Sequence, residues 1–171
     1  IVSETLEHLP VGSAGELVMR GPGVFNGYLG QTDLYESSLT PDGFFRTGDL
    51  AKLDDDGYVH ITGRLKDLII RGGVNISPVG IEDTLAGHPA VRRVAALGEP
   101  DERLGERLCA VVVPSGQSEI SLEVLIEWSS SQGLPRRYWP ESVRVVSEMP
   151  VTAAGKIRKN QLRDELFGGT T

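Results

Sequence analysis

Glycine and proline, the residues that most often form turns, are unusually frequent in this chain. The chain contains 21 Gly and 10 Pro among 171 residues, about 18% of the total where average usage gives roughly 12%. Glycine adopts turn conformations that other residues avoid, and proline lacks the N–H group that regular structure uses. We therefore expect many turns.

Length, cysteine content and charge exclude several classes of protein. The length suits one domain or two small ones, and a single Cys excludes a scaffold held by internal disulfides. The apolar runs are far shorter than the ~20 residues of a membrane-spanning helix, and the first residues show no signal-peptide pattern. A pI near 5.0 argues against binding nucleic acid through bulk positive charge. We expect a cytoplasmic protein with no transmembrane segment.

The acidity is concentrated in the first third of the chain. Through Arg64 there are four basic and ten acidic residues, whereas from Lys66 onward there are 13 and 14. Such an asymmetry predicts a domain boundary near residue 65.

The first part is expected to consist of short strands. Gly15–Arg20 is one candidate, and 50–53 with 58–63 form a predicted hairpin around the turn Asp54–Gly57. We interpret the three consecutive Asp residues of that turn as solvated, because the alternating ligands and distal Glu of a calcium loop are missing. This part resembles the end of a larger domain.

The second part alternates strands and helices, which predicts a compact α+β module. The expected strands are 65–70, 91–97, 108–113 and 142–146, and a glycine-rich loop covers 71–75. One expected helix has Ser77 as its cap and Pro78 at its first position, a second is capped by Ser121, and a third covers 159–167.

Several common functional motifs are absent. Gly155-Lys156 resembles the end of a P-loop, but Pro150 stands where the first glycine should be and no Ser or Thr follows the lysine. The three His residues are too scattered to predict a metal site. Cys109 lies in an apolar run, which favours a buried structural thiol over a nucleophile.

Three other segments are more informative together than alone. They are Phe45–Asp49 (FRTGD), Gly63–Ile69 (GRLKDLI) and Pro150–Lys159 (PVTAAGKIRK). In this order, with a Gly72-Gly73 loop after the second, they resemble the adenylate-forming superfamily of acyl-CoA synthetases, peptide-synthetase adenylation domains and beetle luciferases. The resemblance covers nearly the whole chain and is closest to an AMP-binding acyl-CoA synthetase acting on a fatty or aromatic acid.

The resemblance implies a ligase that uses ATP, Mg²⁺ and coenzyme A, with an acyl-adenylate and then a thioester as products. It implies that residues 1–65 are the β-rich end of a large N-terminal AMP-binding domain and that 66–171 are a mobile C-terminal lid. The superfamily's phosphate loop and acyl pocket are missing from the sequence. We therefore expect the chain to be an inactive fragment without its N-terminal domain.

The resemblance also assigns roles to residues near the boundary. Asp49, next to Thr47, would accept hydrogen bonds from the ribose hydroxyls of ATP, a task that suits an ionised carboxylate. Arg64 would contact the ribose or the phosphates, and Lys66 would be the hinge. The alternative interpretations are a turn aspartate, a surface arginine and a strand-edge lysine.

Two further roles belong to the second part. Lys156 would be the catalytic residue, bridging oxygens of the acid and of the ATP α-phosphate in the first half-reaction. Gly72 and Gly73 would let the thiol arm of coenzyme A pass close to the backbone. A solvated basic tail and an ordinary hairpin turn are the alternatives.

The sequence departs from the superfamily pattern in two places. Gly80 replaces a glutamate in the segment after the glycine loop, and Tyr138 falls one place late, with Arg137 in its slot. Two other functions stay open: a peptide-synthetase-type adenylation domain that loads a carrier protein, and a non-catalytic interaction module with the lid fold.

Overall fold

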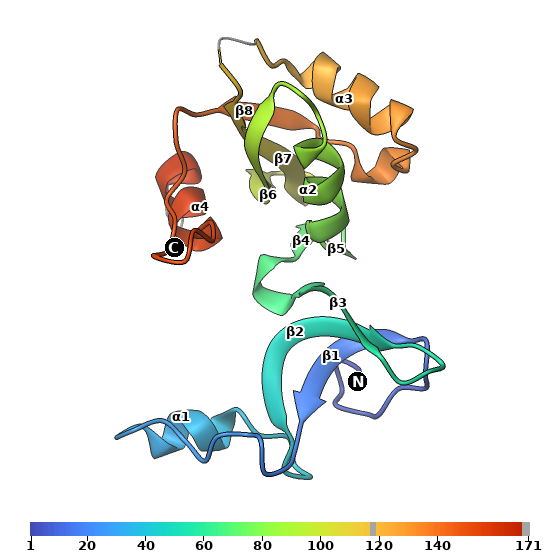
Figure 1. Cartoon of the computed structure of the whole chain (residues 1–171), viewed down its shortest axis with the longest axis vertical. Helices are drawn as coiled ribbons and strands as arrows, with labels where there is room; N and C mark the ends of the chain where they lie inside the picture. The colour runs from blue at the N-terminus through green and yellow to red at the C-terminus, as the bar shows by residue number, and fades with distance from the viewer. Residues whose placement is uncertain (117–118, 169–171) are drawn as a thin grey trace. The chain divides into compact units, whose positions relative to one another are not determined.

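The computed structural model describes residues 1–116 and 119–168, and the chain divides into two compact units, Ile1–Lys66 and Asp67–Thr171 (Figure 1). Each unit contains a β-sheet and short helices, so the predicted α+β fold class is confirmed. No helix in the described ranges is long and apolar enough to cross a membrane. That the first unit ends a large domain, and that the second is a mobile lid, stay predictions.

The first unit is a three-stranded antiparallel sheet in the order β1-β2-β3. The strands are β1 (Ala14–Met19), β2 (Phe45–Leu53) and β3 (Val59–Arg64). A short helix that the sequence did not predict, α1 (Thr32–Ser37), lies between β1 and β2. The ring of Tyr35 in this helix stacks on Phe45 with a centroid distance of 6.0 Å, so an aromatic contact joins α1 to the sheet.

The predicted hairpin between β2 and β3 is confirmed. Asp54 caps its turn, because its carboxylate accepts the backbone N–H groups of Asp56 and Tyr58 at 3.1 and 2.8 Å. It also pairs with His60 at 2.6 Å, and the hydrogen bond from His60 lowers the pKa of Asp54. Residues 55–57 of the turn are exposed, as expected for a solvated turn.

The second unit is built around the long strand β7 (Gly105–Pro114). Along one edge β7 pairs antiparallel with β6 (Val91–Asp101). Along the other edge it pairs with β4 (Ile69–Arg71) and, in parallel, with β8 (Ser142–Val145). The short strand β5 (Val74–Ile76) completes the sheet as the hairpin partner of β4.

Helices cover both faces of this sheet. α2 (Val79–Ala86) and α3 (Leu122–Ser131) contribute Leu85 and Leu125 to the core on one face, and α4 (Lys159–Phe167) contributes Leu162 on the other. Because both faces of β6 and β7 are buried, these strands are continuous apolar runs rather than alternating patterns. The predictions of a buried Cys109 and of a helix over 159–167 are confirmed. Ser121 caps α3 as predicted and accepts the N–H of Val124. The predicted start of α2 is wrong by one residue, because Pro78 and not Ser77 is the N-cap residue and the helix begins at Val79.

Three strands are joined by the buried carboxylate of Glu99 on β6. Arg107 on β7 donates to it at 2.8 Å, and Ser142 and Arg144 on β8 also donate. Burial alone would raise the pKa of Glu99, but these three hydrogen bonds outweigh it and hold the pKa at about 2. The carboxylate is therefore ionised at neutral pH and ties the sheet together across one end.

One predicted strand is wrong over its first half. The segment 65–70 begins as a 3-10 turn, Leu65–Asp67, and the strand starts only at Ile69. Leu65 and Leu68 are three residues apart and both half-buried, a spacing that a 3-10 turn places on one side. The glycine loop that follows is a tight hairpin turn between β4 and β5.

Candidate functional site

The segment Thr47–Asp49 forms a bulge in β2. Between two paired positions, β1 has the single residue Leu17 where β2 has these three residues. Gly48 in their centre has φ +71°, a left-handed conformation that glycine adopts without strain. Bulges redirect side chains away from the regular alternation of a strand, and this one positions Asp49.

The bulge brings three of the predicted site residues together. The Thr47 hydroxyl donates to the carbonyl of Leu17 at 2.7 Å and accepts the N–H of Asp49 at 3.0 Å. Asp49 is paired in register with Arg64 on β3, and Arg64 Nε lies 2.7 Å from Asp49 Oδ1. The Asp49 side chain is 26% exposed and that of Arg64 is 53% exposed. A carboxylate has about four acceptor positions, so Asp49 can accept further hydrogen bonds beside that from Arg64.

A fourth residue, Glu16, supports the bulge and was missed by the sequence analysis. Its buried carboxylate accepts two hydrogen bonds from Arg46, at 2.9 and 2.7 Å, and one from the N–H of Gly48 at 3.2 Å. The sequence could have indicated Glu16, because it lies two residues before Val18 on β1. Residues two apart on a strand lie on the same face, so the charged side chain of Glu16 lies on the buried face with Val18.

The two predicted thiol-path glycines form the turn of the β4–β5 hairpin. Gly72 and Gly73 have φ +56° and +79°, the conformation of a two-residue hairpin turn with positive φ at both positions. A side chain on Gly73 would meet no atom within 4 Å, and one on Gly72 would contact Leu104 at 3.6 Å. Backbone conformation, not crowding, therefore requires these glycines, and the space beside Gly73 is open.

Lys156 lies on a second tight hairpin. The N–H of Thr152 donates to the Lys156 carbonyl at 2.8 Å, and the Thr152 hydroxyl accepts the Lys156 N–H at 3.2 Å. Gly155 makes the turn with φ +78°. Ile157, which follows Lys156, packs against the core under α4. The hairpin is therefore anchored while Lys156 itself is exposed.

A neighbouring lysine has a different environment. Lys159 Nζ, at the start of α4, lies 2.7 Å from Glu82 on α2, and the two side chains are only 15% and 21% exposed. The N–H of Ala96 also donates to Glu82 at 2.7 Å. Burial raises the pKa of Glu82, and Lys159 acts in the opposite direction. This pair joins α4 to α2, and the sequence analysis did not find it.

The predicted site residues therefore fall into separate groups. Thr47, Asp49 and Arg64 form one cluster in the first unit, and Lys66 is exposed in the 3-10 turn at the end of that unit. The glycine hairpin and Lys156 lie on two different hairpins of the second unit.

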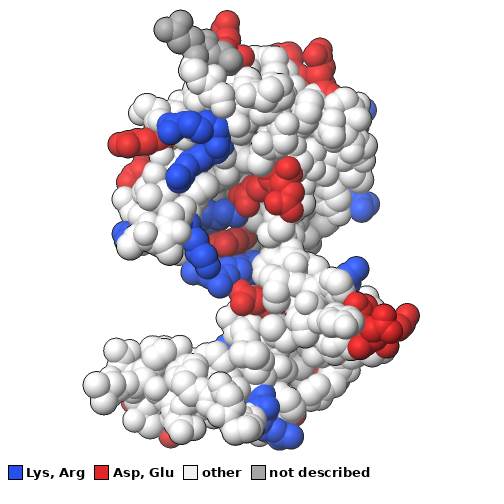
Figure 2. Space-filling model, in the orientation of Figure 1, with Lys and Arg blue, Asp and Glu red and all other residues white. Residues whose placement is uncertain are grey.

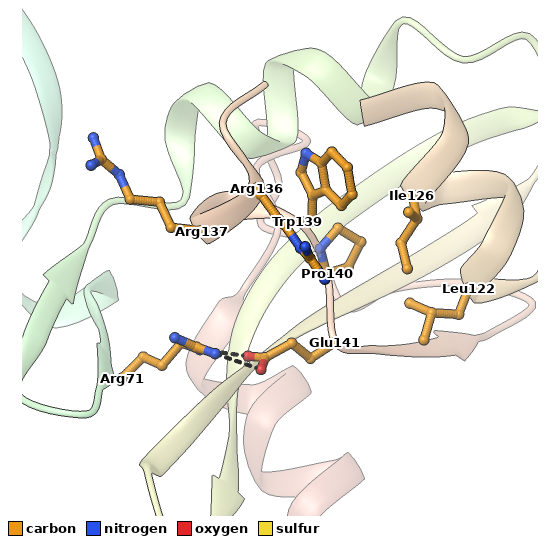
Figure 3. Close-up of a pocket in the computed structure, with 8 residues that line it drawn as sticks. All are labelled: Arg71, Leu122, Ile126, Arg136, Arg137, Trp139, Pro140 and Glu141. Carbon is orange, nitrogen blue, oxygen red and sulfur yellow. Dashed lines mark hydrogen bonds and ion pairs between the residues drawn. The ribbon is translucent and has the colours of Figure 1, made fainter. Parts of the chain in front are cut away.

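A cavity of about 700 Å³ opens on the second unit (Figure 3). Its lining combines arginines with apolar side chains, among them Arg71, Arg136, Arg137, Leu122, Ile126 and Trp139.

Figure 2 shows Lys and Arg grouped on the visible face of this unit and acidic side chains gathered at one edge of the first. Within residues 1–116 and 119–168 no three His, Cys, Asp or Glu side chains are grouped to hold a metal ion.

Comparisons with known proteins identify a matching domain family and several similar enzymes. The model of the AMP-binding enzyme C-terminal domain matches residues 80–156. The medium-chain fatty-acid–CoA ligase of Escherichia coli K12 is 40% identical over 168 residues, which are 98% of this chain and 30% of the relative. Feruloyl-CoA synthase of an Amycolatopsis species is 43% identical over 157 residues, 92% of this chain and 32% of the relative.

A solved structure is also similar to this chain over nearly its whole length. ATP-bound MatB from Rhodopseudomonas palustris matches with a TM-score of 0.87 and 38% identity, over 96% of this chain and 32% of MatB. The chain spans about 30% of the length of the curated relatives that it matches. The chain is therefore similar to the C-terminal portion of AMP-binding, adenylate-forming enzymes, and its residues 80–156 match their C-terminal domain.

Proposed function

We propose that this chain is part of an AMP-forming acid–CoA ligase that converts a fatty or aromatic acid into its CoA thioester in the cytoplasm. The observation that carries the proposal is the cluster of Thr47, Asp49 and Arg64, in which a bulge presents the Asp49 carboxylate 2.7 Å from the Arg64 guanidinium. The relatives named above act, by their names, on a fatty acid and on ferulate, which supports the same substrate classes here.

In the first half-reaction a carboxylate oxygen of the acid attacks the α-phosphorus of ATP. A new P–O bond forms, the bond to pyrophosphate breaks, and pyrophosphate leaves with the electron pair. Asp49 accepts hydrogen bonds from the ribose hydroxyls and so holds the nucleotide. Lys156 bridges the oxygens on which negative charge accumulates, and its exposed position on an anchored hairpin supports that role.

In the second half-reaction the thiol of coenzyme A attacks the acyl carbon of the adenylate. The C–S bond forms, the C–O bond to AMP breaks, AMP leaves with the electron pair, and the thiol proton passes to solvent. The open space beside Gly73 would admit the thiol arm. Lys66 serves as the hinge about which the second unit turns between the two steps.

In the part of the chain that the structure describes, no three His, Cys, Asp or Glu side chains are grouped as a metal site. Mg²⁺ commonly binds through the phosphates of a nucleotide. We therefore assign no residue of this chain as a metal ligand, and we treat the ion as part of the bound ATP.

The proposal is tested by acid-dependent ATP–pyrophosphate exchange, measured on the longer protein that contains this chain. A panel of straight-chain fatty acids and of benzoate, salicylate and ferulate covers the proposed substrates. Exchange that requires one of these acids supports the proposal. Exchange that needs no acid, or none with any member of the panel, contradicts it.

A further inference from the structure

The glycine hairpin is too small to hold its own position. Its strands, β4 and β5, have three residues each, and an isolated two-stranded hairpin is at best marginally stable. β4 joins the rest of the sheet through a single paired position, Arg71 with Gly105. The direction in which Gly72 and Gly73 point must therefore depend on other contacts.

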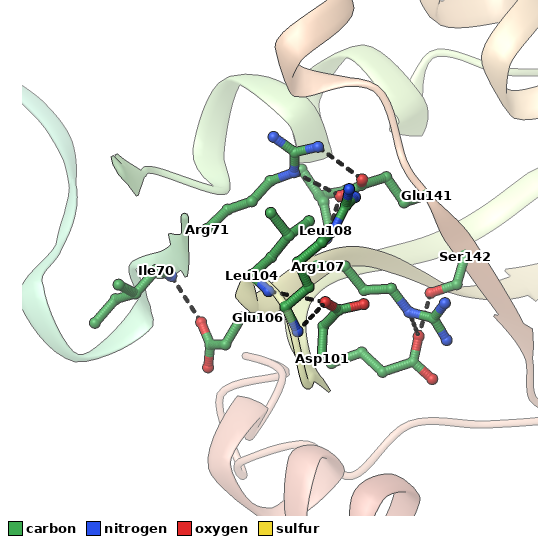
Figure 4. Close-up of polar contacts among 11 residues, drawn as sticks. Ile70, Arg71, Asp101, Leu104, Glu106, Arg107, Leu108, Glu141 and Ser142 are labelled. Atoms are coloured by element: carbon green, nitrogen blue, oxygen red, sulfur yellow. Dashed lines mark hydrogen bonds and ion pairs between the residues drawn. The ribbon is translucent and has the colours of Figure 1, made fainter. Parts of the chain in front are cut away.

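Two of these contacts hold the backbone on either side of Arg71, and the one between Ile70 and Glu106 is drawn in Figure 4. The N–H of Ile70 donates to Glu106 Oε2 at 2.7 Å, and the N–H of Gly72 donates to the carbonyl of Leu104 at 2.8 Å. Gly98 makes room for the Glu106 carboxylate, since a side chain there would come within 2.3 Å of it.

The third contact is an ion pair with two parallel hydrogen bonds. Arg71 Nε and Nη2 donate to Glu141 Oε2 and Oε1 at 2.7 and 2.8 Å (Figure 3). Glu141 is itself fixed to β7: its carboxylate accepts the N–H of Leu108 at 3.2 Å, and its own N–H donates to the Leu108 carbonyl at 2.8 Å. The hydrogen bond from Arg71 lowers the pKa of Glu141, so the carboxylate stays ionised. A bidentate pair fixes orientation as well as distance.

We propose that Arg71 and Glu141 are positioning residues for thioester formation, because their ion pair fixes the direction of the glycine hairpin against β7. This inference rests on the proposed function, in which the thiol arm passes Gly72 and Gly73. The pair is bonded to Leu108 on β7, whereas the Lys156 hairpin is closed by its own hydrogen bonds to Thr152. Loss of the ion pair therefore slows the second half-reaction and leaves the first unchanged.

The test uses Arg71→Ala and Glu141→Gln in the longer protein that contains this chain. Arg107→Ala is the matched control: it also removes an arginine from an Arg–Glu pair in the same sheet, but Arg107 bonds Glu99, which keeps Arg144 and Ser142. ATP–pyrophosphate exchange reports the first half-reaction. Single-turnover transfer of the acyl group from preformed adenylate to coenzyme A reports the second.

We expect Arg71→Ala to slow thioester formation by about tenfold to a hundredfold, the range caused by small misplacements in a site, with exchange at the wild-type rate. Glu141→Gln keeps the acceptor for Leu108 but loses the charge, so its effect is smaller. Arg107→Ala leaves both rates unchanged. Equal slowing of both half-reactions in Arg71→Ala, or no slowing of the second, overturns the inference.

Amide hydrogen exchange separates this inference from the proposed function. In the Arg71→Ala protein, amides of residues 69–76 should exchange about tenfold faster or more, while those of α2 and β6 stay protected. If no acid of the panel supports ATP–pyrophosphate exchange, the proposed function fails on its own. Unchanged protection of residues 69–76 refutes the positioning role whatever the enzyme assays show.

Discussion

Alanine substitutions at Lys156 and Lys159 are expected to affect different properties, activity and stability, although the two lysines are only three residues apart. Lys156 is exposed, and its hairpin is held by backbone atoms and the Thr152 hydroxyl. Lys159 is 15% exposed and paired with Glu82 at 2.7 Å. One change should remove activity without loss of stability, and the other should remove stability.

The structure gives a magnitude for each change. Exposed side chains outside structural networks alter stability by roughly 0.5 kcal/mol or less, so Lys156→Ala should unfold like wild type. A donor to the developing charge lowers the activation barrier by about 2.7–4 kcal/mol. The ATP–pyrophosphate exchange rate of Lys156→Ala should therefore fall by about 10²–10³. Lys159→Ala leaves a largely buried carboxylate unpaired. That change typically costs about 3–5 kcal/mol, and we expect about 2 because Glu82 keeps the N–H of Ala96 and can take up a proton.

Two assays separate these effects. Urea unfolding of the 171-residue chain measures stability, and ATP–pyrophosphate exchange by the longer protein measures adenylation at a temperature where both variants are folded. Lys156→Ala should lose exchange at unchanged urea midpoint, and Lys159→Ala should show a lower midpoint. The reasoning is refuted if Lys156→Ala exchanges pyrophosphate near the wild-type rate, or if Lys159→Ala unfolds at the wild-type midpoint.

Three further predictions concern stability and the sheet. Gly80→Ala should stabilise the chain by about 0.5–1 kcal/mol, because it improves helix propensity and the new side chain meets no atom within 4 Å; an unchanged or lower urea midpoint would oppose this. Gly98→Ala should displace the Glu106 carboxylate, which would lie 2.3 Å from the new side chain, and raise amide exchange at the start of β4; wild-type protection there would contradict it. Folding lowers the pKa of Glu99 from 4.5 to about 2. Its contribution to the free energy of unfolding is therefore present above pH 4.5 and is lost as pH falls toward 2. Glu99→Gln should flatten the pH dependence of unfolding in that window, and an unaltered profile would exclude this role.

Local patterns predicted those parts of the fold that local physics determines. The Asp-Gly hairpin, the Ser121 cap and the helix over 159–167 each depend on residues close in sequence, and each is present. The predicted strand over 65–70 is wrong over its first half because Leu65 and Leu68, separated by Lys66 and Asp67, suit a 3-10 turn as well as a strand.

The sequence suggested candidate site residues, which stay a prediction, but it did not indicate their geometry. Nothing local to Thr47–Asp49 indicates a bulge, because the bulge exists only in the register of β2 against β1. The supports that sequence reasoning missed, Glu16 with Arg46 and Glu82 with Lys159, join residues far apart in the chain. Only folding brings such pairs together.

The central claim is tested most directly by product stoichiometry. The longer protein that contains this chain is incubated with ATP, Mg²⁺, coenzyme A and the panel acid that gives the fastest exchange, and nucleotides and thioester are measured together. We predict that AMP, pyrophosphate and acyl-CoA form one for one, and that none forms without the acid. Formation of ADP in place of AMP, or of AMP with no acyl-CoA, would contradict an AMP-forming acid–CoA ligase.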